Sequence, residues 1–212
     1  MRSIPHRRGA IGRSIRHRIG PTAVVLAALL SAGSILAACS GSPYTSFDPS
    51  GPCAVNGRYP GAYPGLEAQV PTTFLGRGPD QLDSGRNCTA AELGTLAGHG
   101  LTEVRYAGGT WNTSANSGVT LAVFTGQGLT AEWLGEWYES SARAASNTRQ
   151  IDPTRPMIDG RQGYRLDTVN DESNQTVVTW PSMTPDVVYV VVTADTSAAD
   201  IESAIKAFPT GS

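Results

Sequence analysis

A chain of 212 residues can form one domain of ordinary size even after an amino-terminal segment is removed. The net charge of −2 hides an asymmetry, because residues 1–38 contain six arginines and no acidic residue. The rest of the chain therefore holds 10 basic residues against all 18 acidic ones, a formal charge of −8. Such a charge disfavours nucleic-acid binding and, by itself, cannot attract the chain to anionic lipid headgroups.

The first 38 residues have the three-part layout of a secretory signal. Residues 1–20 are basic, residues 22–38 are apolar, and small residues precede position 39. Positive charge is retained on the cytoplasmic side of a membrane, so the chain that follows is expected to be exported. The alternative is an uncleaved transmembrane anchor. However, the apolar run contains Ser31 and Ser34 and is shorter than the roughly 20 strongly apolar residues that a span needs.

The residues at the end of this run are Leu36, Ala37, Ala38 and Cys39. They resemble the lipobox of bacterial prolipoproteins, in which the Cys thiol receives a diacylglyceryl group and a dedicated peptidase cuts just before it. The resemblance implies that Cys39 becomes the acylated first residue and that the protein is held on the extracytoplasmic face of the cell membrane. Two or more acyl chains provide a stable anchor, at about 0.8 kcal/mol per buried methylene.

Residues 39–65 are expected to be a lipidated, flexible tether. Ser, Gly and Pro dominate its first half, a composition typical of spacers. Two Tyr-Pro-Gly triplets, residues 59–61 and 63–65, indicate turns near its end. The segment is therefore predicted to connect the membrane anchor to the folded domain. Its aromatic residues, Tyr44, Phe47, Tyr59 and Tyr63, are expected to fold back on that domain, because an exposed apolar strip is costly. The alternative is a strip that contacts sugar or the cell wall.

The chain contains three cysteines, an odd number. If Cys39 carries lipid, Cys53 and Cys88 remain as one pair, and an oxidising compartment favours a disulfide between them. Such a bond would fasten the amino end to the folded body. The alternative is two separate buried thiols.

Residues 66–212 are expected to form a single globular domain. The strands are expected over residues 103–106, 119–124, 163–169, 175–180 and 186–193. The helices are expected over residues 89–98, from Thr130 to about residue 145, and from Thr196 or Ser197 to Phe208. A turn is expected at Gly108-Gly109.

These elements predict an α+β fold, with an antiparallel sheet of about five strands and about three packed helices. The run Val187–Val192 is the most β-prone stretch and is predicted to be a central strand covered on both faces. In shape alone, the order of elements resembles the small sandwich folds of photosystem-associated domains and of lipid- or protein-binding periplasmic domains. Such a resemblance in shape does not identify a function.

Few residues after position 38 can support catalysis. His99 is the only histidine there, and it lies between two glycines at the end of a predicted helix. Ser84 lacks a predicted strand or helix and the Gly-x-Ser-x-Gly elbow of hydrolases. With Cys53 and Cys88 paired, neither remains as a nucleophile or as a zinc ligand. The sequence therefore predicts no catalytic residue, no metal site and no cofactor.

Four polar residues precede or follow the start of the first predicted helix. They are Asp80, Asp83, Arg86 and His99. If the domain has a polar pocket, these residues are the candidates for it.

The leading hypothesis is a membrane-tethered, non-enzymatic binding or interaction domain. Its expected partner is the membrane, through the lipid on Cys39, while a protein, lipid or cell-wall ligand remains open. One alternative is a hydrolase of the cell envelope that uses His99. Another is an accessory subunit of an envelope complex.

Overall fold

The computed structural model describes residues 44–171 and 173–210. Within these residues, the chain forms an eight-stranded antiparallel sheet, a separate two-stranded hairpin and five helices. The predicted α+β class is confirmed, whereas the predicted counts of about five strands and about three helices are too low. The predicted signal peptide, residues 1–38, and Cys39 lie outside the described residues. In the described part, no helix is long and apolar enough to cross a bilayer.

The sheet contains strands from the whole length of the described chain. Its strands are β1 (Gly57–Tyr59), β2 (Gln81–Asn87), β3 (Val104–Asn112), β4 (Gly118–Thr125), β5 (Thr148–Thr154), β8 (Tyr164–Asn170), β9 (Asn174–Pro181) and β10 (Val187–Ala194). The hairpin consists of β6 (Met157–Ile158) and β7 (Arg161–Gln162). The helices are α1 (Pro64–Glu67), α2 (Ala90–Leu93), α3 (Thr95–Gly98), α4 (Ala131–Ala144) and α5 (Ala198–Lys206). In space the strands follow the order β1-β2-β3-β4-β10-β9-β8-β5.

The strand β10 lies in the middle of the sheet, between β4 and β9. Successive side chains of a strand point to opposite faces. Accordingly, Val188 and Val190 join one buried apolar cluster, and Val187 and Val191 join the other. The prediction of a central strand covered on both faces is confirmed.

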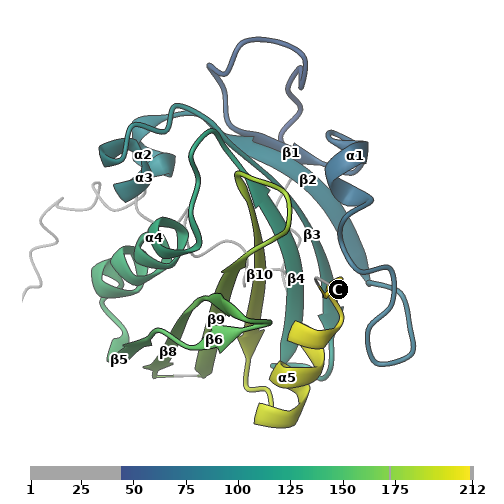
Figure 1. The fold of residues 1–212 in the computed structure, drawn as a ribbon, viewed down its shortest axis with the longest axis vertical. Coiled ribbons are helices and arrows are strands. Elements are labelled where there is room, and N and C mark those ends of the chain that lie inside the picture. Colours follow the sequence, from purple (N-terminus) through teal and green to yellow (C-terminus); the bar gives the residue numbers. More distant parts are fainter. Residues whose placement is uncertain (1–43, 172, 211–212) are drawn as a thin grey trace, which may run out of the picture.

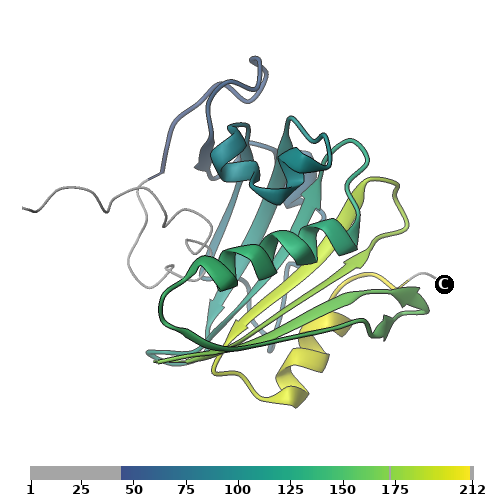
Figure 2. The ribbon, with the colours of Figure 1, turned by 90° about the vertical axis from the view of Figure 1, so that its left-hand side faces the viewer.

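Helices cover both faces of the sheet, and Figure 1 shows α4 and α5 on opposite sides of it. On one side, which we call the α4 face, α4 lies across β8 and β9 (Figure 2), and α3 packs against α4. On the other side, the α5 face, α5 packs against β10 and α1 packs against β2 and β3. The buried residues of α4 include Leu134, Trp137 and Tyr138, as their helical spacing predicts.

Three helices begin at residues whose side chains cap the first turn. The hydroxyl oxygens of Thr89, Thr130 and Ser197 each accept a hydrogen bond from the backbone N–H three residues later. The helix predicted from Thr89, however, is split into α2 and α3 at Gly94, whose φ of +51° is left-handed. A Cβ atom at Gly94 would lie 3.4 Å from the Trp137 ring, so the break also makes room for α4.

The turn predicted at Gly108-Gly109 is wrong. Both glycines lie inside β3, where Gly108 pairs with Ala122 and Gly109 pairs with Leu121 of β4. A Cβ atom on Gly109 would lie 2.9 Å from the ring of Trp111, which folds over that position. The glycine therefore serves close packing within a strand rather than a change of chain direction.

Three strands do not follow the sequence patterns. β2 contains no β-branched residue, and it places Ser84, predicted to lie outside any strand, in the sheet. β5 is a polar edge strand that contains Pro153, as edge strands tolerate. β1 lies within the segment predicted as a flexible tether, and Thr45 pairs with its residue Arg58. From Thr45 onward, that segment is part of the folded domain, so the tether prediction is wrong there.

Candidate functional site: a polar pocket on the α4 face

The four residues predicted for a polar pocket do not come together. Asp83 and Arg86 both belong to β2, but they are three positions apart, so their side chains point to opposite faces of the sheet. Arg86 shares the α5 face with Leu82, whereas Asp83 lies on the α4 face. Asp80 precedes the strand, and its carboxylate accepts a hydrogen bond from Arg77 Nη1 at 2.5 Å.

His99 lies just after α3, beside α4. Its ring stacks on Trp133 with the centroids 4.4 Å apart, and its Nε2 lies 3.1 Å from Glu136 Oε2. Among residues 44–171 and 173–210, no hydroxyl or thiol hydrogen-bonds to this ring. The geometry therefore places His99 in a stacking contact and not beside a nucleophile of the described chain.

Arg86 fastens residues 44–56, which we call the N-terminal arm, to the sheet. Its side chain is 3% exposed and lies 4.8 Å from the centroid of the Phe47 ring. The guanidinium donates to three carbonyl oxygens of the arm, those of Gly51 (2.9 Å), Pro52 (3.0 Å) and Val55 (3.2 Å). A buried guanidinium is stable only when its donors are paired, so the arm and Arg86 depend on each other.

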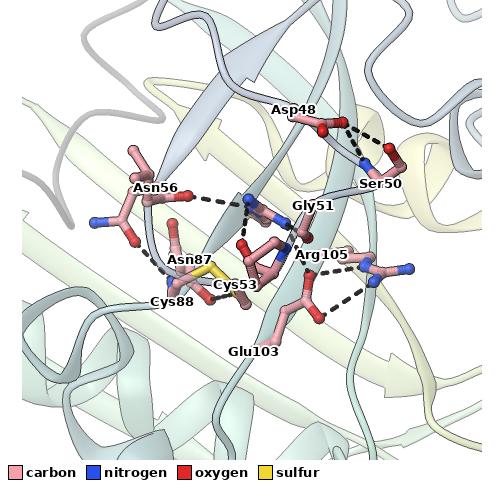
Figure 3. Close-up of polar contacts among 12 residues, drawn as sticks. Asp48, Ser50, Gly51, Cys53, Asn56, Asn87, Cys88, Glu103 and Arg105 are labelled. Atoms are coloured by element: carbon pink, nitrogen blue, oxygen red, sulfur yellow. Dashed lines mark hydrogen bonds and ion pairs between the residues drawn. A yellow bond between two sulfur atoms is a disulfide. The ribbon is translucent and has the colours of Figure 1, made fainter.

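The predicted disulfide between Cys53 and Cys88 is present and fastens the same arm. Figure 3 shows Asn56 next to it. Asn56 Oδ1 accepts a hydrogen bond from the backbone N–H of Cys88 at 2.6 Å, and its Nδ2 donates to Thr89 Oγ1 at 3.0 Å. One covalent bond and several directional hydrogen bonds thus hold the arm against the start of α2.

One group of three residues in the described chain has the spacing of a metal site. The ligand atoms of Cys53, Cys88 and Glu103 lie within 4.8 Å of one another. Metal ions bind cysteine as the thiolate, and here both sulfur atoms are used in the disulfide. This group is therefore not a metal site while the disulfide is intact.

A pocket lies on the α4 face over the first four strands of the sheet. At its centre, Gly108 and Ala122 are paired across β3 and β4 and contribute almost no side chain. The rings of Tyr106 and Phe124 stack 5.5 Å apart on one side of it. A Cβ atom added to Gly108 would make only ordinary contacts, 3.5 Å from Ala122 Cβ, so a side chain there would enter the pocket without a clash at its first atom.

The pocket contains a buried carboxylate. Asp83 is 6% exposed, and its Oδ2 accepts a hydrogen bond from Gln81 Nε2 at 2.6 Å. Arg58 Nε lies 3.5 Å from the same oxygen. Burial raises the pKa of Asp83, although the bond from Gln81 and the charge of Arg58 oppose that change. The pocket thus offers a poorly solvated acceptor beside a guanidinium.

Hydroxyl groups complete the polar lining of the pocket. Thr110 Oγ1 and Thr120 Oγ1 lie 3.2 Å apart on β3 and β4. Burial raises the pKa of Tyr106 to about 12, so its hydroxyl keeps its proton and can donate. The cavity has a volume of about 30 Å³, which is enough for one or two water molecules or for one small polar group that hydrogen-bonds to this lining.

Sequence reasoning named Asp83 but not the other pocket residues. Tyr106, Gly108 and Thr110 alternate along β3, and this alternation is the signal that could have placed them on one face. The glycine pair favours a turn, which ends the predicted strand at residue 106. Arg58 lies in the predicted tether, away from the predicted elements of the domain.

A second, partly buried polar contact joins α4 to β8. The Tyr164 hydroxyl donates to Glu139, and Arg155 lies over the Tyr164 ring at 3.9 Å. The hydrogen bond from Tyr164, with a further one from Arg143, holds the pKa of Glu139 below its usual value. Tyr164 is 0% exposed, and a Cβ atom on Gly135 would lie 2.2 Å from its ring. The hydrogen bond and the close packing between Gly135 and Tyr164 hold α4 against β8.

No protein-family model, curated protein or solved structure matches this chain.

Proposed function

We propose that the protein is a lipoprotein, anchored through Cys39 to the extracytoplasmic face of the cell membrane, whose folded domain binds a ligand. The observation that supports the anchor is the use of the cysteines. Two of the three form the Cys53–Cys88 disulfide, a bond typical of exported proteins. The remaining one, Cys39, stands at the end of the lipobox-like run Leu36-Ala37-Ala38.

The binding role rests on the pocket of the α4 face. Asp83 and Arg58 place opposite charges at its edge, and the stacked ring of Tyr106 lies beside them. Gly108 keeps the centre open although its backbone conformation does not require glycine. The small cavity fits one polar group of a ligand, such as a sugar hydroxyl or a peptide amide, and it disfavours a phosphate because the carboxylate would repel an anion.

The anchor is tested by Cys39→Ser expressed in a bacterial host that processes prolipoproteins. The unchanged protein should accept radiolabelled palmitate and partition with membranes, whereas Cys39→Ser should accept no label and lose the cut before residue 39. Cys53→Ser with Cys88→Ser is the matched control, and it should still accept the label. If the purified unchanged protein begins at Met1, the anchor proposal is wrong.

The pocket is tested by thermal-shift measurements on the mature protein with panels of sugars, short peptides and lipids. A compound that raises the melting temperature should do so less, by at least threefold, in Gly108→Val, which fills the pocket. The control is Gly98→Val, where no atom lies within 4 Å of the added Cβ. Equal shifts in both variants would place binding elsewhere. Hydrolysis of a compound that His99→Ala abolishes would support the enzyme alternative instead.

A further inference from the structure

The structure sets a short distance between the proposed anchor and the sheet. The backbone of Thr45 exchanges two hydrogen bonds with that of Arg58, at 3.1 and 3.2 Å, so the ordered pairing begins only six residues after Cys39. A chain spans at most about 3.3–3.6 Å per residue. The acylated residue and strand β1 can therefore be separated by no more than about 20 Å.

The arm transmits this restraint to the whole domain. It is joined to β2 by the Cys53–Cys88 disulfide and by the three hydrogen bonds of Arg86. Phe47 packs against Tyr59, with the ring centroids 5.3 Å apart, at the start of the arm. Because these contacts leave no free hinge between Thr45 and β2, the domain and the arm must turn together.

Both ribbon views place β1 and the N-terminal arm at one end of the long axis and α5 at the other (Figures 1 and 2). A compact domain of this length measures about 40 Å across. If α5 lay against the bilayer, most of that width would separate β1 from the membrane, more than the reach of about 20 Å from Cys39. The inverted orientation is therefore excluded once Cys39 is in the membrane.

The arm carries apolar side chains that suit a membrane interface. Tyr44 is 51% exposed and Val55 is 54% exposed, and they are two of the five large hydrophobic residues exposed in the described chain. Tyrosine is enriched at the headgroup level, where its ring and hydroxyl are both accommodated. The formal charge of −8 after residue 38 supplies no attraction to anionic lipid, so the restraint must come from the connection to Cys39.

We propose that the N-terminal arm is a membrane-contacting surface, with Tyr44 and Val55 at the headgroup level and α5 directed away from the bilayer. This inference rests on the lipid anchor proposed above. It adds an orientation that acylation alone does not imply, because a long flexible tether would leave every face of the domain free to meet the membrane.

The test uses lipoprotein purified from membranes and reconstituted into phosphatidylcholine vesicles that contain brominated lipid, which quenches tryptophan on contact. A tryptophan is added at either end, as Tyr44→Trp in the arm or as Lys206→Trp in α5. Lys206 is the matched control because its side chain is 76% exposed. The emission added by Tyr44→Trp should fall by at least half, and that added by Lys206→Trp should not change. Equal quenching at both positions would overturn the orientation.

A second variant tests whether the short connection between Cys39 and Thr45 causes the proposed orientation of the domain. Insertion of 20 Gly and Ser residues after Gly41 should reduce the quenching of Tyr44→Trp at least twofold, because a flexible linker lets the domain turn. Unchanged quenching would overturn this explanation. Coupling the mature chain to a maleimide lipid through the Cys39 thiol repeats the measurement without natural acylation, so failure of the anchor and failure of the orientation are distinguished.

Discussion

The N-terminal arm and the central strand β10 are held in place by different forces. The valine side chains of β10 are buried on both faces of the sheet, and many weak van der Waals contacts together hold the strand in place. The arm depends on one disulfide and on the guanidinium of Arg86. Loss of one apolar contact weakens a core gradually, whereas loss of one strong polar partner leaves buried groups unpaired. The N-terminal arm should therefore be released by changes to these few groups that leave the sheet folded.

The largest effect is expected from removal of the disulfide. Cys53→Ser with Cys88→Ser should lower the free energy of unfolding by about 4 kcal/mol, because the bond closes a separation of 35 residues in the unfolded chain. Urea unfolding of the chain produced from residue 39 onward measures this loss, and Cys39→Ser in the same chain should show none. A loss below about 1 kcal/mol would contradict the estimate, since native disulfides typically contribute more.

A smaller loss, about 2–3 kcal/mol, is expected for Arg86→Met, which leaves three carbonyl groups of the arm without their donor. Hydrogen exchange should accelerate in residues 44–56 and stay slow in β10. The control is Arg105→Met, because the Arg105 side chain is 45% exposed and its ion pair with Glu103 contributes little. Exchange that accelerates equally in β10 would show that the arm and the core open as one unit.

The core side of the comparison is tested by Gly135→Ala in α4. The added Cβ atom would lie 2.2 Å from the Tyr164 ring, so overpacking should cost about 2 kcal/mol. Chemical denaturation measures this loss, and hydrogen exchange should now accelerate across the sheet as well as in the arm. Gly98→Ala, which meets no atom within 4 Å, should not destabilise the protein. If Gly135→Ala melts like the unchanged protein, the contact between α4 and β8 is looser than described.

A pH-dependent loss of about 1 kcal/mol is expected for Glu139→Gln, since a partly exposed charged hydrogen bond is weakened by solvent. The hydrogen bond from Tyr164 lowers the pKa of Glu139 below 4.5 in the folded state. The stabilisation is therefore complete above pH 4.5 and is lost as the pH falls through the folded pKa. Melting temperatures measured from pH 7 to pH 3 should converge for the two proteins. A gap that stays constant with pH would contradict this origin.

The smallest effect, with the opposite sign, is expected for Asp83→Asn in the pocket. Burial raises the pKa of Asp83 above 3.8, so the unchanged protein loses stability as the pH rises from 3.8 through the folded pKa. An amide can still accept the hydrogen bond from Gln81 and carries no charge to bury. The variant should therefore be as stable as the unchanged protein at pH 7, or slightly more stable. A clear loss at pH 7 would mean that the Arg58 pair outweighs burial.

Sequence patterns predicted the elements whose signals are local. The hydroxyl caps at Thr89 and Thr130 and the apolar spacing of α4 depend only on neighbouring residues, and the structure confirms them. The pairing of Cys53 with Cys88 was predicted because only these two cysteines remain once Cys39 is assigned to the lipid, and the structure confirms it. The predicted polar pocket was not assembled, because Asp83 and Arg86 alternate across a strand that the sequence did not reveal.

By itself, the sequence determined the α+β class and the central strand, because periodicity and capping depend on short stretches of chain. It also determined the disulfide, because the small number of cysteines leaves one pair once Cys39 is assigned to the lipid. Only the tertiary structure decided that Thr45 and β1 pair into the sheet and that Gly108 lies in a strand. Those outcomes depend on partners far apart in the chain. The carbonyls of Gly51 and Pro52 find Arg86, and the small surface of Gly108 meets Ala122, only after the sheet has formed.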